Sequence, residues 1–464
     1  MSSQDWNQAH LQPVCDAIWD LEEELNLFDW QIGGHYVWPL LRMPFYYNIT
    51  QQLGFFDNPH PGKNSHQESF DVAAATRALW DRIGEDRKFR RGNRAKLFRW
   101  KSQPGRYVVV PHGRLTAGTE IYTDAVRQQI GRHGLVIERA PRAGFEGLDL
   151  ASVKQILGYQ MRKLDVPEFK DDVVLDAIAQ GIHTKLNVDV RPFLDTVPQR
   201  FELFVRRSFV YETMFKRAGT EKLFFTDSYY SVALAAGARR AGVRLIELQH
   251  GFISRFHLGY SFPRGQSHPY LADELWTFGQ YWNDETPFSP ATSLRIIGAP
   301  YVAELAAQHA TERVAQRVVF TSQGAIGAAL LPVAIEAARQ LPDYEIFFRL
   351  HPSENLEDVQ GTVDGLGATP TNFTINARTP NIFALLASAD IQVGVFSTTL
   401  LEGMALGCRT AIVALPGSEY MSLVVERGDA SIAYSPDQVV AAIQNAPYAQ
   451  SAEYYYAKPE SKLI

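Results

Sequence analysis

Two histidines directly follow apolar runs that are typical of buried strands. The run 245–248 ends at a turn that contains His250, and the run 345–350 ends at His351. In open α/β sheets, ligands bind in the crevice outside the carboxyl ends of the strands, where helix N-termini and exposed loop groups gather. We therefore predict that both histidines lie at ligand-binding edges and that two sheets share one active site.

A carboxylate is predicted at a third strand end. The apolar run 223–226 leads into Asp227, which would lie beside His250 if the two strands are neighbours. A carboxylate in this place can take a proton from a hydroxyl group or attack an electrophilic carbon, and the sequence does not choose between these roles. Asp227 or Ser228 would equally well cap the Ala-rich helix that follows. Asp227 and His250 are the predicted catalytic residues.

Small hydroxyl side chains indicate a phosphate site in the second half of the chain. Ser397 and Thr398 follow the apolar run 391–395 and precede a helical segment. At a helix N-terminus, free N–H groups and the helix dipole favour an anion. The same two residues would serve as ordinary N-caps. Glu402 lies about one turn into this helix, where it would bind a ligand or simply complement the dipole.

Further binding candidates follow other predicted strand ends. Ser322 and Gln323 end the first strand of the second half, and Pro352 biases His351 away from helical geometry. Arg255, His257 and Arg264 in the loop after His250 would form a cradle for an acidic sugar or an acceptor, although a solvated loop explains them equally well. Gln249 and Gly251, beside His250, are further candidates for contact with the sugar or acceptor.

The composition is that of an ordinary globular protein. The chain has 464 residues, of which 46% are hydrophobic and 21% are charged, and its formal net charge is −6. This charge provides no global attraction to nucleic acid or anionic lipid. Because single hydrophobic cores stop growing near about 250–300 residues, we expect two domains with elaborations.

Cysteine usage predicts neither a disulfide nor a metal site. The chain contains only Cys15 and Cys408, far apart and without metal-ligand spacing, and no Asp-x-Asp motif follows a predicted strand. We therefore expect no metal, no cofactor and a reducing, cytoplasmic setting. The first residues lack a secretory signal pattern, and no apolar stretch of about 18 residues occurs, so neither export nor a membrane span is expected.

The alternation of strand and helix patterns predicts an α/β fold with two Rossmann-like, doubly wound domains. The strands predicted for the first domain are 107–110, 134–137, 223–226, 245–248, 272–277 and 296–300, and those for the second are 318–321, 345–350, 391–395 and 409–413. A linker is predicted near 300–315. The expected division is a helical, aromatic-rich cap (1–104), a first domain with a helical insertion (105–305), a second domain (306–445) and a C-terminal tail (446–464).

A basic stretch closes the predicted cap. Eight basic residues between Arg87 and Lys101 alternate with aromatic and apolar residues, with no acidic residue among them. One interpretation is a solvated helix face. Another is a peripheral contact with an anionic membrane surface, to which each basic residue contributes about 1 kcal/mol. Binding to nucleic acid is disfavoured by the acidic chain as a whole and by the absence of a nucleic-acid motif.

Several of these residues together resemble a known enzyme group. The set is similar, in chain order and in its places at strand ends, to the capsule-synthesis glycosyltransferases of Gram-negative bacteria. The nearest likeness within that group is to the CMP-Kdo-dependent Kdo transferases, and a more distant one is to sialyltransferases that use CMP-activated sugars. The likeness covers roughly residues 220–420 and is carried by Gln249, His250, Gly251, Gly259, Tyr260, His351, Pro352, Ser397, Thr398, Glu402 and Gly403.

The resemblance implies a fold and a role for each site. It implies the GT-B arrangement, in which two Rossmann-like domains face each other, with the donor bound by the second. His351 would contact the nucleotide phosphate and assist departure of CMP, and Glu402 would bind the donor ribose. Asp227 would be the nucleophile of a retaining reaction or the base of an inverting one. Gln249, Gly251, Arg255 and His257 would face the sugar or the acceptor.

The sequence therefore predicts a metal-independent glycosyltransferase of the cytoplasm, peripheral to the inner face of the membrane. It would transfer Kdo or a related acidic sugar from a CMP-activated donor to a surface-polysaccharide or lipid-linked glycan. Alternatives are a CDP-polyol phosphotransferase of the teichoic-acid type, a non-catalytic subunit of a polysaccharide assembly complex, and a UDP-sugar 2-epimerase.

Overall fold

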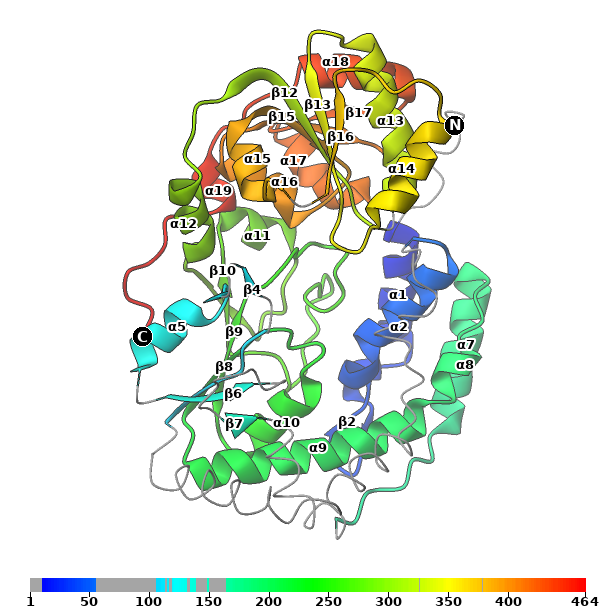
Figure 1. Cartoon of the computed structure of the whole chain (residues 1–464). Coiled ribbons are helices and arrows are strands. Elements are labelled where there is room, and N and C mark those ends of the chain that lie inside the picture. Colours follow the sequence, from blue (N-terminus) through cyan, green and yellow to red (C-terminus); the bar gives the residue numbers. More distant parts are fainter. Residues whose placement is uncertain are drawn as a thin grey trace, which may run out of the picture.

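The computed structural model consists of two parallel β-sheets with helices on both faces (Figure 1). It describes residues 11–55, 106–112, 115–116, 119–131, 134–138, 148–149, 164–324, 326–377 and 379–464. The basic stretch from Arg87 to Lys101 lies outside the described residues, so its predicted role stays a prediction. Within the described part of the chain, no helix has the length and apolar character needed to cross a membrane.

The first sheet has seven strands in the order β11-β10-β9-β8-β3-β6-β7, and neighbouring strands are parallel. Its central strands are buried along most of their length, which is typical of a parallel sheet covered on both faces. The strands are β3 (Tyr107–Val109), β6 (Gly134–Glu138), β7 (Leu148–Asp149), β8 (Lys222–Phe225), β9 (Arg244–Leu248), β10 (Glu274–Thr277) and β11 (Ser293–Ile296).

Helices from the N-terminal segment and the helical insertion cover one face of this sheet and share its largest hydrophobic cluster. A buried ion pair between Arg42 and Glu22 joins two of these helices, and the Trp38 indole N–H donates to Glu22 Oε1 at 2.8 Å. The helices are α1 (Leu11–Glu24), α2 (Trp38–Gln52), α7 (Asp172–Leu186), α8 (Arg191–Leu194), α9 (Val197–Ala218) and α10 (Val232–Arg240). On the other face, α5 (Asp124–Ile130) packs against the strands through Val126 and Ile130.

The second sheet has six strands in the order β14-β13-β12-β15-β16-β17, again all parallel. Its strands are β12 (Val314–Thr321), β13 (Glu345–Arg349), β14 (Phe373–Asn376), β15 (Ala389–Gly394), β16 (Arg409–Val413) and β17 (Ser431–Ala433). Its helices include α13 (Gly327–Gln340), α14 (Leu356–Gly365), α15 (Ile382–Ser388), α16 (Thr398–Ala405), α17 (Ser422–Glu426) and α18 (Val439–Gln444).

A shared hydrophobic cluster joins the two halves. It contains Tyr122 and Tyr260 from the first half and Leu400 and Leu401 from the second. It also contains side chains of the connecting helices α11 (Gln280–Glu285), α12 (Pro300–Gln308) and α19 (Ala452–Tyr455). The carboxyl edges of the two sheets therefore pack toward each other.

The predicted tail returns to the first sheet. After α19 the chain runs down the side of the molecule to the C-terminus beside α5, drawn in red in Figure 1. The Ala457 N–H donates to Phe278 O at 2.8 Å, and the Glu460 N–H donates to Ile297 O at 2.9 Å. Leu463 enters the cluster under α5. This segment therefore ties the end of the second half to the first.

The predicted fold class is confirmed, and one predicted strand is misplaced. The segment 296–300 was expected to be a strand, but β11 ends at Ile296 and α12 begins at Pro300. β11 is an edge strand whose first residues are exposed, so it lacks the apolar run that identifies a buried strand. Helix α12 also occupies most of the region predicted as a linker.

Candidate active site

Asp227 occupies a strained turn at the carboxyl end of β8. Its φ is 56°, in the left-handed region that few residues other than glycine adopt. Its carbonyl accepts hydrogen bonds from Tyr230 N–H at 3.0 Å and Ser231 N–H at 2.8 Å, and only 5% of the residue is exposed. Helix α10 begins later, and its N-cap, Ser231, makes no side-chain capping bond. The turn thus directs Asp227 away from the capping role.

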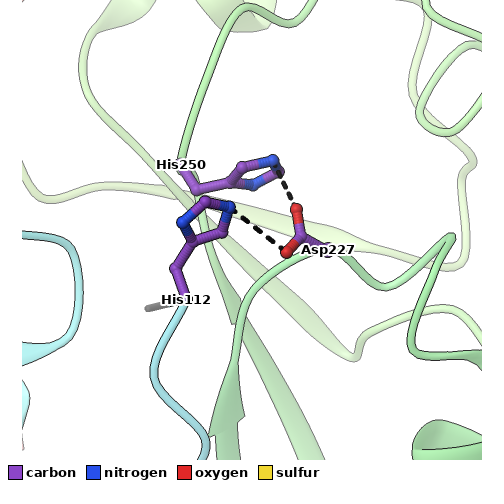
Figure 2. Close-up of side chains that lie close together, drawn as sticks. All are labelled: His112, Asp227 and His250. Atoms are coloured by element: carbon purple, nitrogen blue, oxygen red, sulfur yellow. Dashed lines mark ion pairs between the residues drawn. The ribbon is translucent and has the colours of Figure 1, made fainter. Parts of the chain in front are cut away.

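Two imidazoles flank the Asp227 carboxylate (Figure 2). His250 Nε2 lies 2.5 Å from Asp227 Oδ1, and His112 Nε2 lies 3.4 Å from Oδ2. The imidazole rings stack with centroids 5.0 Å apart and planes inclined by 23°. The three residues follow β3, β8 and β9, which are neighbours in the sheet. The structure therefore brings the predicted pair Asp227 and His250 together and adds His112.

His112 was not among the predicted site residues. The signal was nevertheless present, since the apolar run 107–110 is followed by Pro111 and His112, the same pattern that identified His250. The order of the strands, which puts β3 beside β8, decides that this histidine reaches Asp227. That order is not visible in the sequence.

The environment of His250 indicates where its proton lies. Its Nδ1 is buried and has no hydrogen-bond partner. A proton on Nδ1 would be a buried donor without an acceptor, which costs about 1–3 kcal/mol. We infer that Nε2 carries the proton and that this N–H donates a hydrogen bond to Asp227 Oδ1. A second contact at Nε2 is the Tyr229 hydroxyl at 3.3 Å.

A buried hydrogen-bond network around Glu247 supports the turn that contains Asp227. Glu247 Oε1 accepts a hydrogen bond from Ser228 N–H at 2.9 Å and another from the Tyr260 hydroxyl at 2.6 Å. Burial raises the pKa of the Glu247 carboxyl. Since Ser228 directly follows Asp227, these bonds fix the conformation that places Asp227 between the histidines.

Most of the predicted acceptor-side residues have structural contacts. Gln249 is 1% exposed, and its side chain bonds to Gly251 O and Phe278 N–H at 3.0 and 2.9 Å. Arg255 pairs with buried Glu285 through two contacts of 3.1 and 3.2 Å. In this structure these side chains hold the loop after His250, and Gly251 contributes only its backbone carbonyl to the contact with Gln249.

His257, also predicted to face the ligand, is partly buried and packs against two tyrosines beside the site. Its ring contacts Tyr229 and Tyr260 at centroid distances of 4.9 and 5.0 Å. Burial lowers the pKa of His257 to about 3. His257 is therefore a neutral packing residue in this structure rather than a ligand-facing one.

A hollow of about 390 Å³ lies at the carboxyl end of β13. His351 and Pro352, two of the predicted donor-binding residues, line it, and both are exposed. The His351 ring lies with Nδ1 2.7 Å from Ser353 Oγ. Ser322, in contrast, is buried, and its hydroxyl donates to Glu354 Oε1 at 2.9 Å. Gln323 does not line this hollow.

Glu402 of α16 is linked to the three-residue site through a chain of aromatic rings. Tyr122 contacts His112 and Tyr301 at centroid distances of 5.4 and 5.8 Å, and the Tyr301 hydroxyl donates to Glu402 Oε1 at 3.0 Å. Glu402 is 4% exposed, so it bonds within the chain rather than facing a ribose as the resemblance implied. Burial is the physical reason for this difference.

Ser397 and Thr398 occupy the predicted helix N-terminus. Ser397 is the N-cap of α16, and its hydroxyl accepts from Thr399 N–H at 3.1 Å. The capping interpretation is thus confirmed for Ser397. Thr398 is the first residue of the helix and is half-buried.

The site residues also have the types that bind a metal ion. Ligand atoms of His112, Asp227 and His250 all lie within 4.8 Å of one another. Ligation by Nε2 would require the proton of His250 to move to Nδ1, which has no acceptor. Metal-bound histidines usually donate this second N–H to a partner. The surroundings of His250 therefore fit a hydrogen bond to Asp227 better than a metal.

Comparisons with known proteins show distant structural likeness. No known family matches the sequence, and neither does any curated protein. A UDP-GlcNAc 2-epimerase from Methanocaldococcus jannaschii has 10% identity and a TM-score of 0.41, covering 73% of this chain and 92% of its own. MurG from Acinetobacter baumannii has 12% identity and a TM-score of 0.41, covering 76% and 94%. At this level, the likeness carries no argument about activity.

Proposed function

We propose that this chain is a glycosyltransferase that moves an acidic sugar from a CMP-activated donor to a glycan acceptor. The observation that carries the proposal is the buried Asp227 carboxylate, fixed between two imidazoles at the edge of one Rossmann-like sheet and facing a second such sheet. This is the place where open α/β sheets bind ligands. The ordered motif residues that resemble Kdo transferases support the choice of donor.

Asp227 has the fixed position that a nucleophile needs. His250 Nε2 lies 2.5 Å from Asp227 Oδ1 and His112 Nε2 lies 3.4 Å from Oδ2, so both carboxylate oxygens are held by imidazoles. In the proposed first step, an Asp227 oxygen forms a bond to the anomeric carbon while the bond from that carbon to the CMP oxygen breaks, and CMP leaves with the bonding electrons. In the second step, the acceptor hydroxyl attacks the same carbon, releases the Asp227 carboxylate and gives its proton to a neighbouring imidazole. The net outcome is retention of configuration.

The histidines have separate parts in this scheme. His250 lies closer to Asp227 than His112 does and also contacts Tyr229, so it is the more firmly oriented imidazole. We propose that His250, through its Nε2–H, orients the Asp227 carboxylate, and that the more loosely held His112 takes the proton of the acceptor hydroxyl. General acid–base groups of this kind contribute about 10²–10⁴-fold to a rate.

The experiment that tests the proposal measures nucleotide release from a panel of donors. Purified chain is incubated in EDTA with CMP-Kdo, CMP-sialic acid, UDP-GlcNAc, a GDP-sugar and CDP-glycerol, each with and without oligosaccharide acceptors. We expect CMP release from a CMP-sugar that Asp227→Asn abolishes and that Asp343→Asn, at an exposed carboxylate distant in the fold, leaves intact. Turnover of CDP-glycerol alone would instead identify a polyol phosphotransferase. Absence of turnover with every donor would favour a non-catalytic subunit.

A further inference from the structure

The hollow at the end of β13 contains a carboxylate held by the chain's own donors. Glu354 Oε1 accepts from the Ser322 hydroxyl at 2.9 Å, and Glu354 Oε2 accepts from His351 N–H at 2.6 Å. Ser322 follows β12 and His351 follows β13. The carboxylate therefore bridges the ends of two neighbouring strands of the second sheet.

The same carboxylate lies against the N-terminus of α13. A Cβ atom at Gly327, the first residue of this helix, would lie 1.9 Å from Glu354 Oε1 and 2.6 Å from Ser322 Oγ. Only a residue without a side chain allows so close an approach. The N-terminus of the first helix after a strand is where Rossmann-like domains ordinarily take a phosphate. In this chain, Glu354 occupies that position.

The position of Glu354 at this helix end disfavours a phosphate and favours a ligand group that donates hydrogen bonds. A phosphate brought to Ser322 and the His351 N–H would meet a fixed charge of its own sign. The remaining lone pairs of Glu354 accept hydrogen bonds, so the position suits a ligand group that donates them. Apolar side chains form much of the remaining wall and suit the face of a ring, namely Leu350, Pro352, Leu356 and Ala377.

We propose that Glu354 recognises the nucleoside of the donor by accepting hydrogen bonds from it, and that the donor phosphate binds elsewhere. The hydrogen-bond donors on a nucleoside are the ribose hydroxyls and the amino group of the base. The inference rests on the proposed function, because it assumes a nucleotide-activated donor. It reassigns Ser322 from a candidate ligand-binding residue to a residue that positions Glu354, and it fills the role that buried Glu402 does not.

Calorimetric binding to the full chain tests the inference. CMP, 2′-deoxy-CMP, UMP, UDP and GDP are titrated into the wild type, Glu354→Gln and the control Glu357→Gln, an exposed glutamate of the same segment that does not line the hollow. We expect Glu354→Gln to weaken CMP binding about tenfold or more and Glu357→Gln to change it by less than about twofold. A preference for CMP over 2′-deoxy-CMP that disappears in Glu354→Gln identifies the ribose. A preference for CMP over UMP that disappears in Glu354→Gln identifies the amino group of the base as the group that Glu354 contacts.

Two other results overturn the inference in different ways. If the wild type binds CMP and Glu354→Gln binds it equally or more tightly, the carboxylate does not recognise the nucleoside, and the proposed function stands. Tighter binding is the result expected if a phosphate had to displace Glu354. If no nucleotide binds the wild type at millimolar concentration, both the inference and the proposed function fail.

Hydrogen exchange on the unaltered chain keeps the test independent of the variant's folding. Cytidine, which lacks a phosphate, is expected to slow amide exchange in residues 350–356, and inorganic phosphate is expected to leave these amides unchanged. Protection of residues 350–356 by phosphate, without protection by cytidine, would contradict the assignment.

Discussion

At the edge of the first sheet a buried carboxylate lies between two partly buried imidazoles, whereas at the edge of the second a carboxylate and an imidazole line an open hollow. Asp227 and His250 have side-chain exposures of 7% and 11%, while His351 is exposed and Glu354 is half-buried. Burial strengthens electrostatic contacts and fixes geometry, which suits bond making. An open edge suits reversible binding. A polar residue that follows a strand is thus suited to bond making at the first sheet and to reversible binding at the second.

The largest expected effect comes from the buried edge. His250→Ala is predicted to lower kcat about 10²–10³-fold, because it removes the closest donor to the Asp227 carboxylate and with it the group that orients the nucleophile. His112→Ala, which removes the contact of 3.4 Å, is predicted to cost less. Initial rates of CMP release at saturating donor measure both. Equal losses, or a larger loss for His112→Ala, would contradict the larger effect assigned to the orienting histidine.

Stability should depend on pH through histidines that are buried in their neutral form. Burial lowers the pKa of His257 and of His268 to about 3 from 6.5. Below pH 6.5, these two histidines therefore bind protons in the unfolded chain but remain unprotonated in the folded chain. The stabilisation is complete above pH 6.5 and is lost as the pH falls toward 3, by up to about 1.4 kcal/mol per pH unit for each histidine.

Urea unfolding at pH 7, 6 and 5 measures this dependence. His257→Gln is expected to reduce the slope, and His183→Gln, at an exposed position, is expected to preserve it. The same slope in wild type and His257→Gln would show that His257 is protonated in the folded chain, which would contradict its role as a neutral packing residue.

The open edge should give a smaller effect. His351→Ala is expected to weaken CMP binding about fivefold to tenfold, since its exposed ring makes contacts that water partly replaces. It should leave the thermal midpoint unchanged, because the ring is outside the core. Calorimetry and thermal denaturation measure the two quantities. A loss of stability without a loss of affinity would remove His351 from the donor site.

The smallest effect is expected from metal removal. Dialysis against EDTA should change the rate by less than about twofold, because the Nδ1 of His250 lacks the acceptor that ligation through Nε2 requires. Elemental analysis of the purified chain provides the check. Stoichiometric zinc that is lost in both His112→Ala and Asp227→Asn would replace the nucleophile scheme with a metal-assisted one.

The sequence predicts the fold and the strand ends that carry the candidate site residues better than it predicts which side chains these residues contact. Apolar runs identify the buried strands, and each run points to the residue that follows it, which is why Asp227, His250 and His351 were found. Partners depend on strand order and on burial. The adjacency of β3 and β8 makes His112 part of the site, and Tyr301, from a helix outside both sheets, takes up the Glu402 carboxylate.

Local sequence patterns also fail to identify ligand contacts where a polar side chain is buried and bonds within the protein. Gln249 and Ser322 have the residue types of ligand contacts, yet both are buried; Gln249 bonds to Gly251 of its own loop, and Ser322 bonds to Glu354 of the loop after β13. Glu354 follows His351 by three positions and was not predicted, because only the close approach of Gly327 shows that its carboxylate occupies the helix end.

The most direct test of the central claim is to look for the sugar on Asp227. The chain is mixed with a CMP-sugar donor, quenched in acid during turnover and examined by intact-mass and peptide mass spectrometry. The account predicts an added mass of one glycosyl unit on the peptide that contains Asp227, absent in Asp227→Asn and present in Asp343→Asn. Active enzyme that shows no adduct and gives a product of inverted configuration would contradict it.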